Sequence, residues 1–275
     1  MRKIEEAVAR HYGASGLLAR IYAGLEASGA DLDNLQPDDL APVEEFHIGG
    51  RVATARAVEK LSPQEDHHVL DVGCGIGGTV RFIAGQVGCR VTGIDLTPDY
   101  IDVAQALTER TGLAGKVSYH VASALDMPFE DASFDAAITL HVAMNIPDRA
   151  GLYGEIARVM KPGARLCVYD VMKKNEEDIT YPVPWAQSAE TSHLTTPDEM
   201  RALLGESGFA VVEVEDRTDF AIEFFQQSLA ASTNGPPPLG LHLLMGASAP
   251  EKFKNMLTNV ESGRIAPVQI IASRG

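Results

Sequence analysis

The chain has 275 residues, 45% of them hydrophobic, which is enough to bury the core of one α/β domain with attachments or of two small domains. Its formal net charge of −15 and its scattered lysine and arginine residues exclude nucleic acid and anionic membrane as expected partners, because phosphates recruit clustered basic side chains. A small molecule then remains as the expected ligand. No apolar run reaches the length of about 18 residues that a transmembrane helix needs, so we expect no membrane partner.

The first 50 residues predict a helical cap, and residues 51–275 form the main domain with its insertions. Amphipathic patterns predict short helices over 2–10 and 16–28. Asp, Pro and Gly residues interrupt the pattern over 31–50, which excludes a long helix there. A helical period resumes over 51–61, just ahead of the first strand.

From residue 69 onward, strand and helix patterns alternate regularly, which predicts a parallel sheet built from βαβ units. The predicted strands are the apolar run that ends at Gly73, followed by 90–95, 117–121, 134–139, 165–170, 211–214 and 267–272. The predicted helices among them are 98–111, which Gly112 closes, 149–160, which ends in Lys161-Pro-Gly163, and 197–208.

Two segments are too long to be ordinary connections, and we expect them to cover the acceptor site. The first, at about 173–195, contains Tyr181-Pro-Val-Pro-Trp185 with the only tryptophan of the chain. The second, at about 219–264, contains helical patterns that Gly235-Pro-Pro-Pro238 interrupts.

The stretch His68-Val-Leu-Asp-Val-Gly-Cys-Gly-Ile-Gly-Gly78 predicts a strand that turns sharply around a nucleotide-like ligand. Its glycines permit positive φ and let a ligand touch bare backbone. The next strand ends at Asp95, 20 positions after Gly75, where a carboxylate can accept hydrogen bonds from ribose hydroxyls. Asp71 disfavours the pyrophosphate of a dinucleotide dehydrogenase, the alternative for such a turn, and favours the ammonium group of a methionine moiety.

The motif Asp-x-Gly-x-Gly-x-Gly at 71–77 and the Gly-x-Asp at 93–95 resemble the first two motifs of class I S-adenosylmethionine-dependent methyltransferases. Residues 127–135 and 158–163 resemble later motifs of the small-molecule enzymes of this family, so that the resemblance covers about residues 69–170. It implies S-adenosylmethionine as cofactor, with S-adenosylhomocysteine as product, and methyl transfer by in-line displacement. It also implies a doubly wound α/β fold with seven strands, mainly parallel, the last antiparallel.

The resemblance assigns cofactor-binding roles along the ends of the strands. In the family an acidic residue usually accepts a hydrogen bond from the adenine amino group. Here that position is Ser123, which either accepts this bond while the Ala124 N–H serves a ring nitrogen, or caps a turn. The residues predicted to bind the cofactor are Asp71, Gly73, Gly75, Gly77, Asp95, Leu96, Ser123, Ala124 and Leu140.

Candidates for the acceptor site come from the cap and from the tip of the fourth strand. His141 at this tip is a general base, a polar lining residue or a hydrogen-bonded structural histidine. Asn145 orients the acceptor or closes a turn. Tyr12 lies near the sulfonium, or joins two cap helices, and Phe46 and His47 belong to a turn of the cap that folds over the site.

The loop of Tyr181 and Trp185 either lines the acceptor pocket or plugs the insertion against the sheet, with His193 in the same roof. Aromatic faces suit a methylated amine, and the cap, the Phe46 turn and this loop look most like glycine, sarcosine and dimethylglycine N-methyltransferases. Quinone C-methyltransferases and natural-product O-methyltransferases are alternatives, and a hydroxyl acceptor would need a base such as His141 or His193. A non-catalytic module that binds the cofactor is an alternative of another class.

The cysteines and the first residues bear on the cellular compartment in which we expect the protein. Cys74, Cys89 and Cys167 show neither disulfide nor metal-ligand spacing, so we expect reduced core residues and no metal. Residues 1–6 lack the apolar stretch of a secretory signal, so we expect a cytoplasmic protein. In such folds cap helices often make the contacts of a homodimer, an alternative to a monomer that the sequence leaves open.

Overall fold

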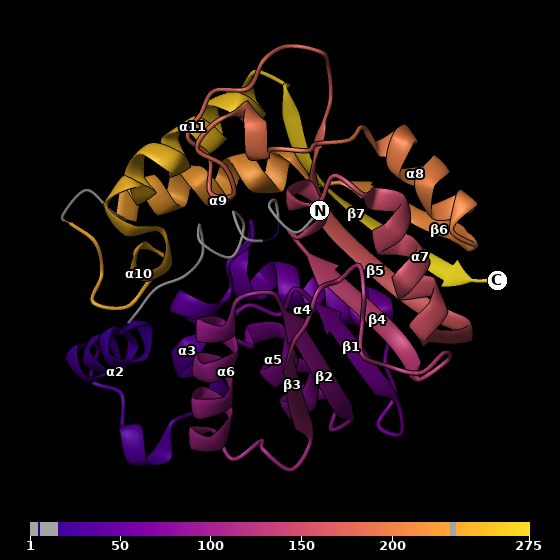
Figure 1. Cartoon of the computed structure of the whole chain (residues 1–275). Coiled ribbons are helices and arrows are strands. Elements are labelled where there is room, and N and C mark those ends of the chain that lie inside the picture. The colour runs from indigo at the N-terminus through magenta and orange to yellow at the C-terminus, as the bar shows by residue number, and fades with distance from the viewer. Residues whose placement is uncertain (1–4, 6–15, 232–234) are drawn as a thin grey trace.

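The computed structural model describes residue 5, residues 16–231 and residues 235–275. A seven-stranded sheet in the order β3-β2-β1-β4-β5-β7-β6 forms its centre (Figure 1). All neighbouring strands are parallel except β7, which runs antiparallel to β5 and β6. The predicted fold class is therefore confirmed. The strands are β1 (His68–Val72), β2 (Arg90–Asp95), β3 (Val117–Val121), β4 (Phe134–Leu140), β5 (Met160–Lys173), β6 (Phe209–Asp216) and β7 (Ile265–Arg274).

The antiparallel part of the sheet is longer than the sequence predicts. Strand β5 pairs with β7 from Arg165 to Lys173, beyond the predicted end at Asp170. At its other end Met160 already pairs with Phe134, so Lys161-Pro-Gly163 lies within β5 and is not a separate turn. Pairing between strands decides these ends, and local sequence patterns do not carry that information.

Helices cover both faces of the sheet. Leu70 and Val72 of β1 point into a core with α7 and α8, whereas Val69 points into a core with α4 and α5 on the opposite face. This alternation follows from the two-residue period of a strand, and burial on both faces explains why the strands are almost continuously apolar. The helices that build the two faces are α4 (Gly50–Leu61), α5 (Gly78–Gln86), α6 (Pro98–Arg110), α7 (Arg149–Val159) and α8 (Pro197–Glu206).

The described part of the cap packs against α6 and the glycine turn. It consists of α2 (Leu17–Ala27), a short turn of helix and α3 (Pro37–Glu44). Ile21 and Leu40 share a buried cluster with Tyr100 of α6 and Ile76 of the turn. Apart from Glu5, which is helical, the predicted helix over 2–10 lies outside the described residues, as does Tyr12. The cap thus rests on the edge of the sheet where β1 ends.

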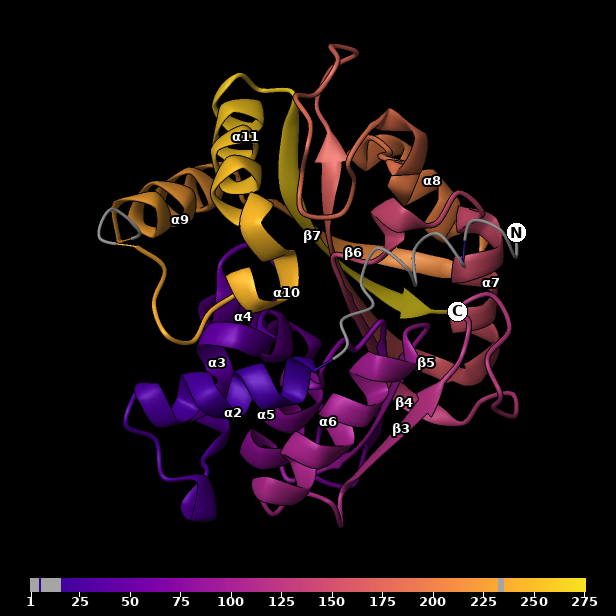
Figure 2. The ribbon, with the colours of Figure 1, turned by 60° about the vertical axis from the view of Figure 1, so that its left-hand side comes forward.

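The described part of the second insertion contains the α-helices α9 (Thr218–Ala231), α10 (His242–Met245) and α11 (Ala249–Glu261). Figure 2 shows α10 and α11 next to one another above the cap helices. Phe225 of α9 and Met256 of α11 share a core with Trp185 of the first insertion. Both insertions therefore cover the same edge of the sheet as the cap.

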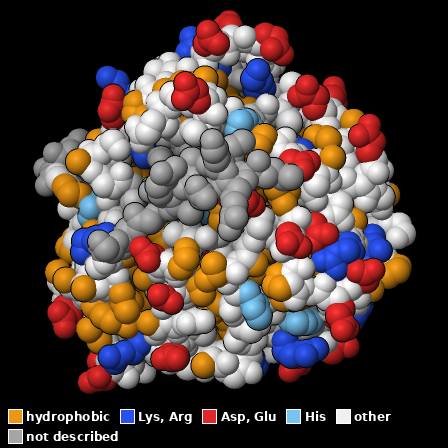
Figure 3. Space-filling model, in the orientation of Figure 1, with side chains coloured by type: hydrophobic (Ala, Val, Ile, Leu, Met, Phe, Trp, Pro, Cys, Tyr) orange, Lys and Arg blue, Asp and Glu red, His pale blue; other side chains and the backbone are white. Residues whose placement is uncertain are grey.

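Surface charge is dispersed on the face that Figure 3 shows, where lysine and arginine side chains lie singly among acidic ones. Within the described residues, no helix combines the length and the apolar character that crossing a membrane requires.

Candidate functional site

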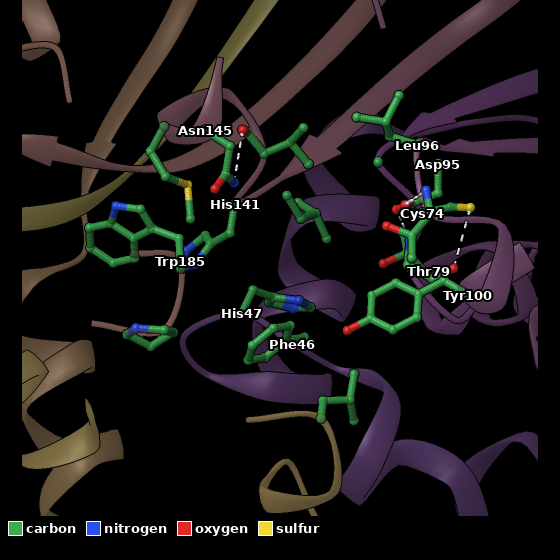
Figure 4. Close-up of a pocket in the computed structure, with 18 of the residues that line it drawn as sticks. Phe46, His47, Cys74, Thr79, Asp95, Leu96, Tyr100, His141, Asn145 and Trp185 are labelled. Atoms are coloured by element: carbon green, nitrogen blue, oxygen red, sulfur yellow. Dashed lines mark hydrogen bonds between the residues drawn. The ribbon is translucent and has the colours of Figure 1, made fainter. Parts of the chain in front are cut away.

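One pocket opens where the parallel strands β1, β2 and β4 end, beneath the cap and the two insertions. Figure 4 shows its two ends. Asp95, Leu96 and Tyr100 lie at one end, and His141 and Trp185 at the other, with Phe46 and His47 between them. The predicted residues that line it are Phe46, His47, Asp71, Gly73, Gly75, Asp95, Leu96, Ser123, Ala124, Leu140, His141, Asn145 and Trp185.

Gly75 presents bare backbone to the pocket. Its φ is +54°, and a Cβ placed there would meet no atom within 4 Å, so a side chain would project into the open pocket. The Gly75 N–H donates to Asp95 Oδ2 at 2.9 Å, and the Thr97 N–H donates to Asp95 Oδ1 at 2.9 Å. The turn is thereby fixed by the carboxylate at the end of the neighbouring strand.

Gly73 and Gly77 serve packing. A Cβ on Gly73 would lie 2.4 Å from the side chain of Val142, and one on Gly77 would lie 2.3 Å from the Tyr119 hydroxyl. Gly77 is not among the residues that line the pocket, so its contact with the cofactor stays a prediction. This glycine is required because Tyr119 and Arg81 occupy the space beside it.

Two carboxylates face the end of the pocket that Asp95 marks. Asp71 is 2% exposed, and burial, followed by the charges of Asp95 and Glu45, raises its pKa to about 8. Burial also raises the pKa of Asp95, while the backbone N–H groups of Thr97 and Gly75 oppose this shift. A cation placed beside Asp71 would favour its ionised form.

Ser123 caps a turn, as one of its two predicted roles has it, and it also lines the pocket. Its Oγ accepts a hydrogen bond from the Leu125 N–H at 3.1 Å, which caps the turn after β3. The same hydroxyl donates to Oε1 of Glu5 at 2.5 Å. Glu5 also lines the pocket, and therefore brings a carboxylate to the position where the sequence has only a serine. No local motif marks Glu5, because it lies 118 residues from Ser123.

The backbone of His141 is held by a hydrogen bond to the neighbouring strand. Its φ is +56°, and its N–H donates to the Tyr169 carbonyl at 2.7 Å. The ring lies 5.0 Å from that of Tyr169 and 6.0 Å from that of His47, measured between centroids. Nε2 of His141 is buried without a hydrogen-bond partner among the described residues. Burial, followed by His47, lowers the pKa of His141 well below its ordinary value, so the ring is neutral at pH 7.

The ring of His47, unlike that of His141, has a hydrogen-bond partner at Nε2. Its Nε2 lies 2.9 Å from Thr54 Oγ1, whose hydroxyl also donates to Glu45 Oε2 at 2.5 Å. Because a hydroxyl has one proton, Thr54 accepts from the Nε2–H of His47 when it donates to Glu45. Burial lowers the pKa of His47 to about 4, so this ring is neutral as well.

Trp185 is both a lining residue and part of the packed core. It is 3% exposed, and its indole N–H donates to Ser192 Oγ at 3.0 Å. Asn145 also lines the pocket, and its Nδ2 donates to the Val142 carbonyl at 3.2 Å, which closes the turn after β4. Each of the two residues thus has a structural role in the fold and also faces the pocket.

Tyr181 and His193 are not among the described lining residues, and here the structure differs from the prediction. Tyr181 packs against the cluster around Trp185 and bonds to Ser192. The His193 N–H donates to the Met144 carbonyl at 2.9 Å, and its own carbonyl accepts from Arg149. Both backbone groups of His193 are thus tied to residues of the segment after β4.

The second insertion contributes lining residues that sequence reasoning missed. The helical pattern over 219–264 was the only signal, and it does not say which face of each helix meets the pocket. The aromatic wall consists of Phe224 and Phe225 of α9 and Phe253 of α11, and further apolar lining comes from Leu241, Leu244 and Met256. Among the described residues, no group of three or more His, Cys, Asp or Glu side chains is placed to hold a metal ion.

Comparisons with known proteins identify relatives along most of the chain. The family model of a methyltransferase domain matches residues 70–168. The O-methyltransferase resE of Aspergillus sclerotiorum is 35% identical over 187 residues, which cover 66% of this chain and 69% of that protein. An O-methyltransferase of Pyrenophora dematioidea is 32% identical over 222 residues, which cover 78% of this chain and 81% of that protein.

The fold is also similar to solved structures. One is a geranyl diphosphate C-methyltransferase from Streptomyces coelicolor A3(2) in complex with Mg²⁺, geranyl-S-thiolodiphosphate and S-adenosylhomocysteine. The TM-score is 0.73 at 18% identity, and the match covers 99% of this chain and 98% of that one. At this identity the similarity is one of fold.

Proposed function

Because the chain belongs to the class I S-adenosylmethionine-dependent methyltransferases, we propose that it transfers the methyl group to a hydroxyl of a small, largely apolar molecule. The observation that carries this proposal is the buried Nε2 of His141, which has no hydrogen-bond partner among the described residues. A hydroxyl has to lose its proton to become a good nucleophile, and a neutral imidazole within reach is the usual acceptor of that proton.

The residues at one end of the pocket fit S-adenosylmethionine. Gly75 leaves backbone open for close approach, and Asp95 offers carboxylate oxygens to ribose hydroxyls. Asp71 is a buried carboxylate that suits the ammonium of the methionine moiety. Ser123 and Glu5 supply oxygen acceptors for the adenine amino group. When bound, S-adenosylmethionine supplies an electrophilic methyl group on its sulfonium.

At the other end, His141 accepts the hydroxyl proton at Nε2, while the bond from its own N–H to the Tyr169 carbonyl holds its backbone. Tyr169 is in turn held by the bond from its hydroxyl to the Ile48 carbonyl at 3.1 Å, which joins β5 to the segment ahead of α4. His47 is already engaged by Thr54, so we assign it a positioning role beside the base. Trp185, Phe224 and Phe253 exclude water and orient an apolar acceptor.

An amine acceptor, which the sequence favours, uses the same aromatic wall but leaves His141 without a task, because a free amine attacks without a base. The two relatives named above are O-methyltransferases, which also supports a hydroxyl acceptor. Methylation at carbon remains the third outcome of the test.

The test is a screen of purified protein with S-adenosylmethionine and separate pools of phenols, alcohols, quinols and amines. Release of S-adenosylhomocysteine is measured, and the methylated product is identified by mass spectrometry. The proposal predicts turnover with hydroxyl pools that exceeds turnover with amine pools. Turnover with amines alone would contradict it, and binding of S-adenosylhomocysteine without turnover in any pool would favour a non-catalytic module.

A further inference from the structure

We propose that a second, smaller cavity beside the acceptor end of the pocket binds a carboxylate of the acceptor through the ammonium group of Lys252. The cavity has a volume of about 120 Å³. A water molecule occupies about 30 Å³ in the liquid, so this space holds a carboxylate group. Phe46, Pro184 and Leu244 line both cavities, so a single ligand that passes these side chains occupies both.

Lys252 is buried where a lysine is costly. It is 3% exposed and lies in the first turns of α11, close to the helix N-terminus, where the helix dipole disfavours a positive charge. Burial lowers the pKa of its ammonium group, and no carboxylate opposes that shift. Both the loss of contact with water and the helix dipole therefore disfavour the charged ammonium group at this position.

Other lysines of the described chain have a carboxylate partner, which Lys252 lacks among the described residues. Lys60, Lys161 and Lys174 are more exposed, yet each has a carboxylate oxygen within 2.6, 2.5 and 2.8 Å. Lys252 has neither an ion pair nor a hydrogen-bond acceptor among the described residues, although the whole chain has 38 acidic residues against 23 basic ones. A buried charge without a partner is unfavourable, so a partner from outside the chain explains this arrangement best.

The cavity walls favour an oxygen ligand. Besides Lys252 they include Ser248, which directly precedes α11, and Gln187 of the first insertion, which is exposed and marks the opening to solvent. Hydroxyl and amide groups complement a carboxylate whose main partner is an ammonium group. The acceptor then has an apolar body in the aromatic pocket and an acidic end at Lys252. Of this description of the acceptor, only the hydroxyl beside His141 rests on the proposed function; the carboxylate does not.

The experiment measures binding and does not need turnover. Calorimetry on protein saturated with S-adenosylhomocysteine compares phenylacetate, 4-phenylbutanoate and 6-phenylhexanoate with the corresponding neutral amides. We expect the best carboxylate to bind at least about tenfold more tightly than its amide, the effect of about 1.4 kcal/mol from one charge-assisted contact. Lys252→Met should abolish this preference. Lys254→Met, which removes an exposed lysine from the same helix, should keep it.

Thermal melting of the variants accompanies the titrations, and Lys252→Met should be at least as stable as the wild type because it removes an unpaired buried charge. A wild-type protein that does not prefer the carboxylates, including one that binds none of the probes, overturns the proposal even if Lys252→Met does not fold. An equal loss in Lys254→Met also overturns it. If carboxylates are preferred but no hydroxyl acceptor is methylated, the proposed function fails and the Lys252 subsite stands. If a hydroxyl acceptor is methylated but carboxylates are not preferred, the subsite fails and the proposed function stands.

Discussion

The backbone N–H of Gly75 donates a 2.9 Å hydrogen bond to Oδ2 of Asp95, which joins the glycine turn after β1 to the end of β2. Since Oδ1 of the same carboxylate accepts from the Thr97 N–H, Asp95 orders the starts of two loops and still faces the pocket. The proposed site for the cofactor is therefore preformed by bonds within the protein.

Asp95→Ala should weaken the binding of S-adenosylhomocysteine by about 1.5–3 kcal/mol, the usual contribution of hydrogen bonds to a charged acceptor. The loss combines the missing ribose contact with a less ordered glycine turn. Calorimetry measures it, and Asp102→Ala, an exposed carboxylate on α6, is the control. Unchanged affinity in Asp95→Ala would show that this residue does not hold the ribose.

Gly75→Ala should reduce cofactor affinity at least about tenfold, because the new methyl group projects into the pocket. Gly112→Ala is a matched control: Gly112 also has positive φ, +71°, and open space around its Cβ position, but it does not line the pocket. Both variants should lose about 1–2 kcal/mol of stability through backbone strain. Equal cofactor affinity in the two variants would contradict the assignment of Gly75.

Cofactor binding should release a proton from Asp71. Its pKa of about 8 in the free protein means that the carboxyl is largely protonated at pH 7. An ammonium bound beside it favours the carboxylate, so affinity should rise from about pH 6 to pH 8, by at most about tenfold per pH unit. Calorimetry in buffers of different ionisation enthalpy counts the protons, and Asp71→Asn should show no release from this site.

The same residue predicts how stability depends on pH. Asp71 binds its proton more tightly in the folded state than in the unfolded state, where the ordinary value is 3.8. Its contribution to the free energy of unfolding is therefore largest below about pH 4 and falls as the pH rises toward 8. Without ligand, Asp71→Asn should be more stable than the wild type at pH 8, and a lower melting temperature would contradict the burial argument.

Trp185→Ala should raise the KM for the acceptor and leave cofactor affinity nearly unchanged, because Trp185 lies at the end of the pocket away from Asp95. The buried indole also supports the core, so the variant should lose about 3–5 kcal/mol of stability. Ser192→Ala removes only the partner of the indole N–H and serves as the milder comparison. Steady-state kinetics with each substrate varied separates the two effects, and a changed cofactor affinity at constant KM for the acceptor would contradict the assignment.

The sequence predicts the bounds of a strand well where residues close together in the chain determine them, and poorly where pairing with a distant segment does. Strands β2 and β3 coincide with their predicted ranges because short apolar runs between turn residues define them. The ends of β5 and β7 follow from an antiparallel ladder between segments about 100 residues apart, which no window of sequence contains.

The same distinction holds for the site. Gly75 and Asp95 follow from the spacing of one βαβ unit. Phe253 and Lys252 depend on which face of α11 turns toward the pocket, and Glu5 depends on where the N-terminal segment lies. His193 was predicted in the roof from its position in the chain, but the backbone bonds to Met144 and Arg149 decide its place. Sequence patterns describe the elements, whereas the packing of insertions decides the acceptor site.

The central claim is that His141 Nε2 takes the proton of a hydroxyl acceptor, and the most direct test is the kcat of His141→Asn with the best hydroxyl acceptor from the screen. Asparagine tolerates the positive φ of this position, so the backbone is preserved. We predict that kcat falls at least about a hundredfold while affinity for S-adenosylhomocysteine is unchanged, and that His193→Asn keeps its kcat. A His141→Asn enzyme with wild-type kcat, or a loss confined to His193→Asn, would contradict the account.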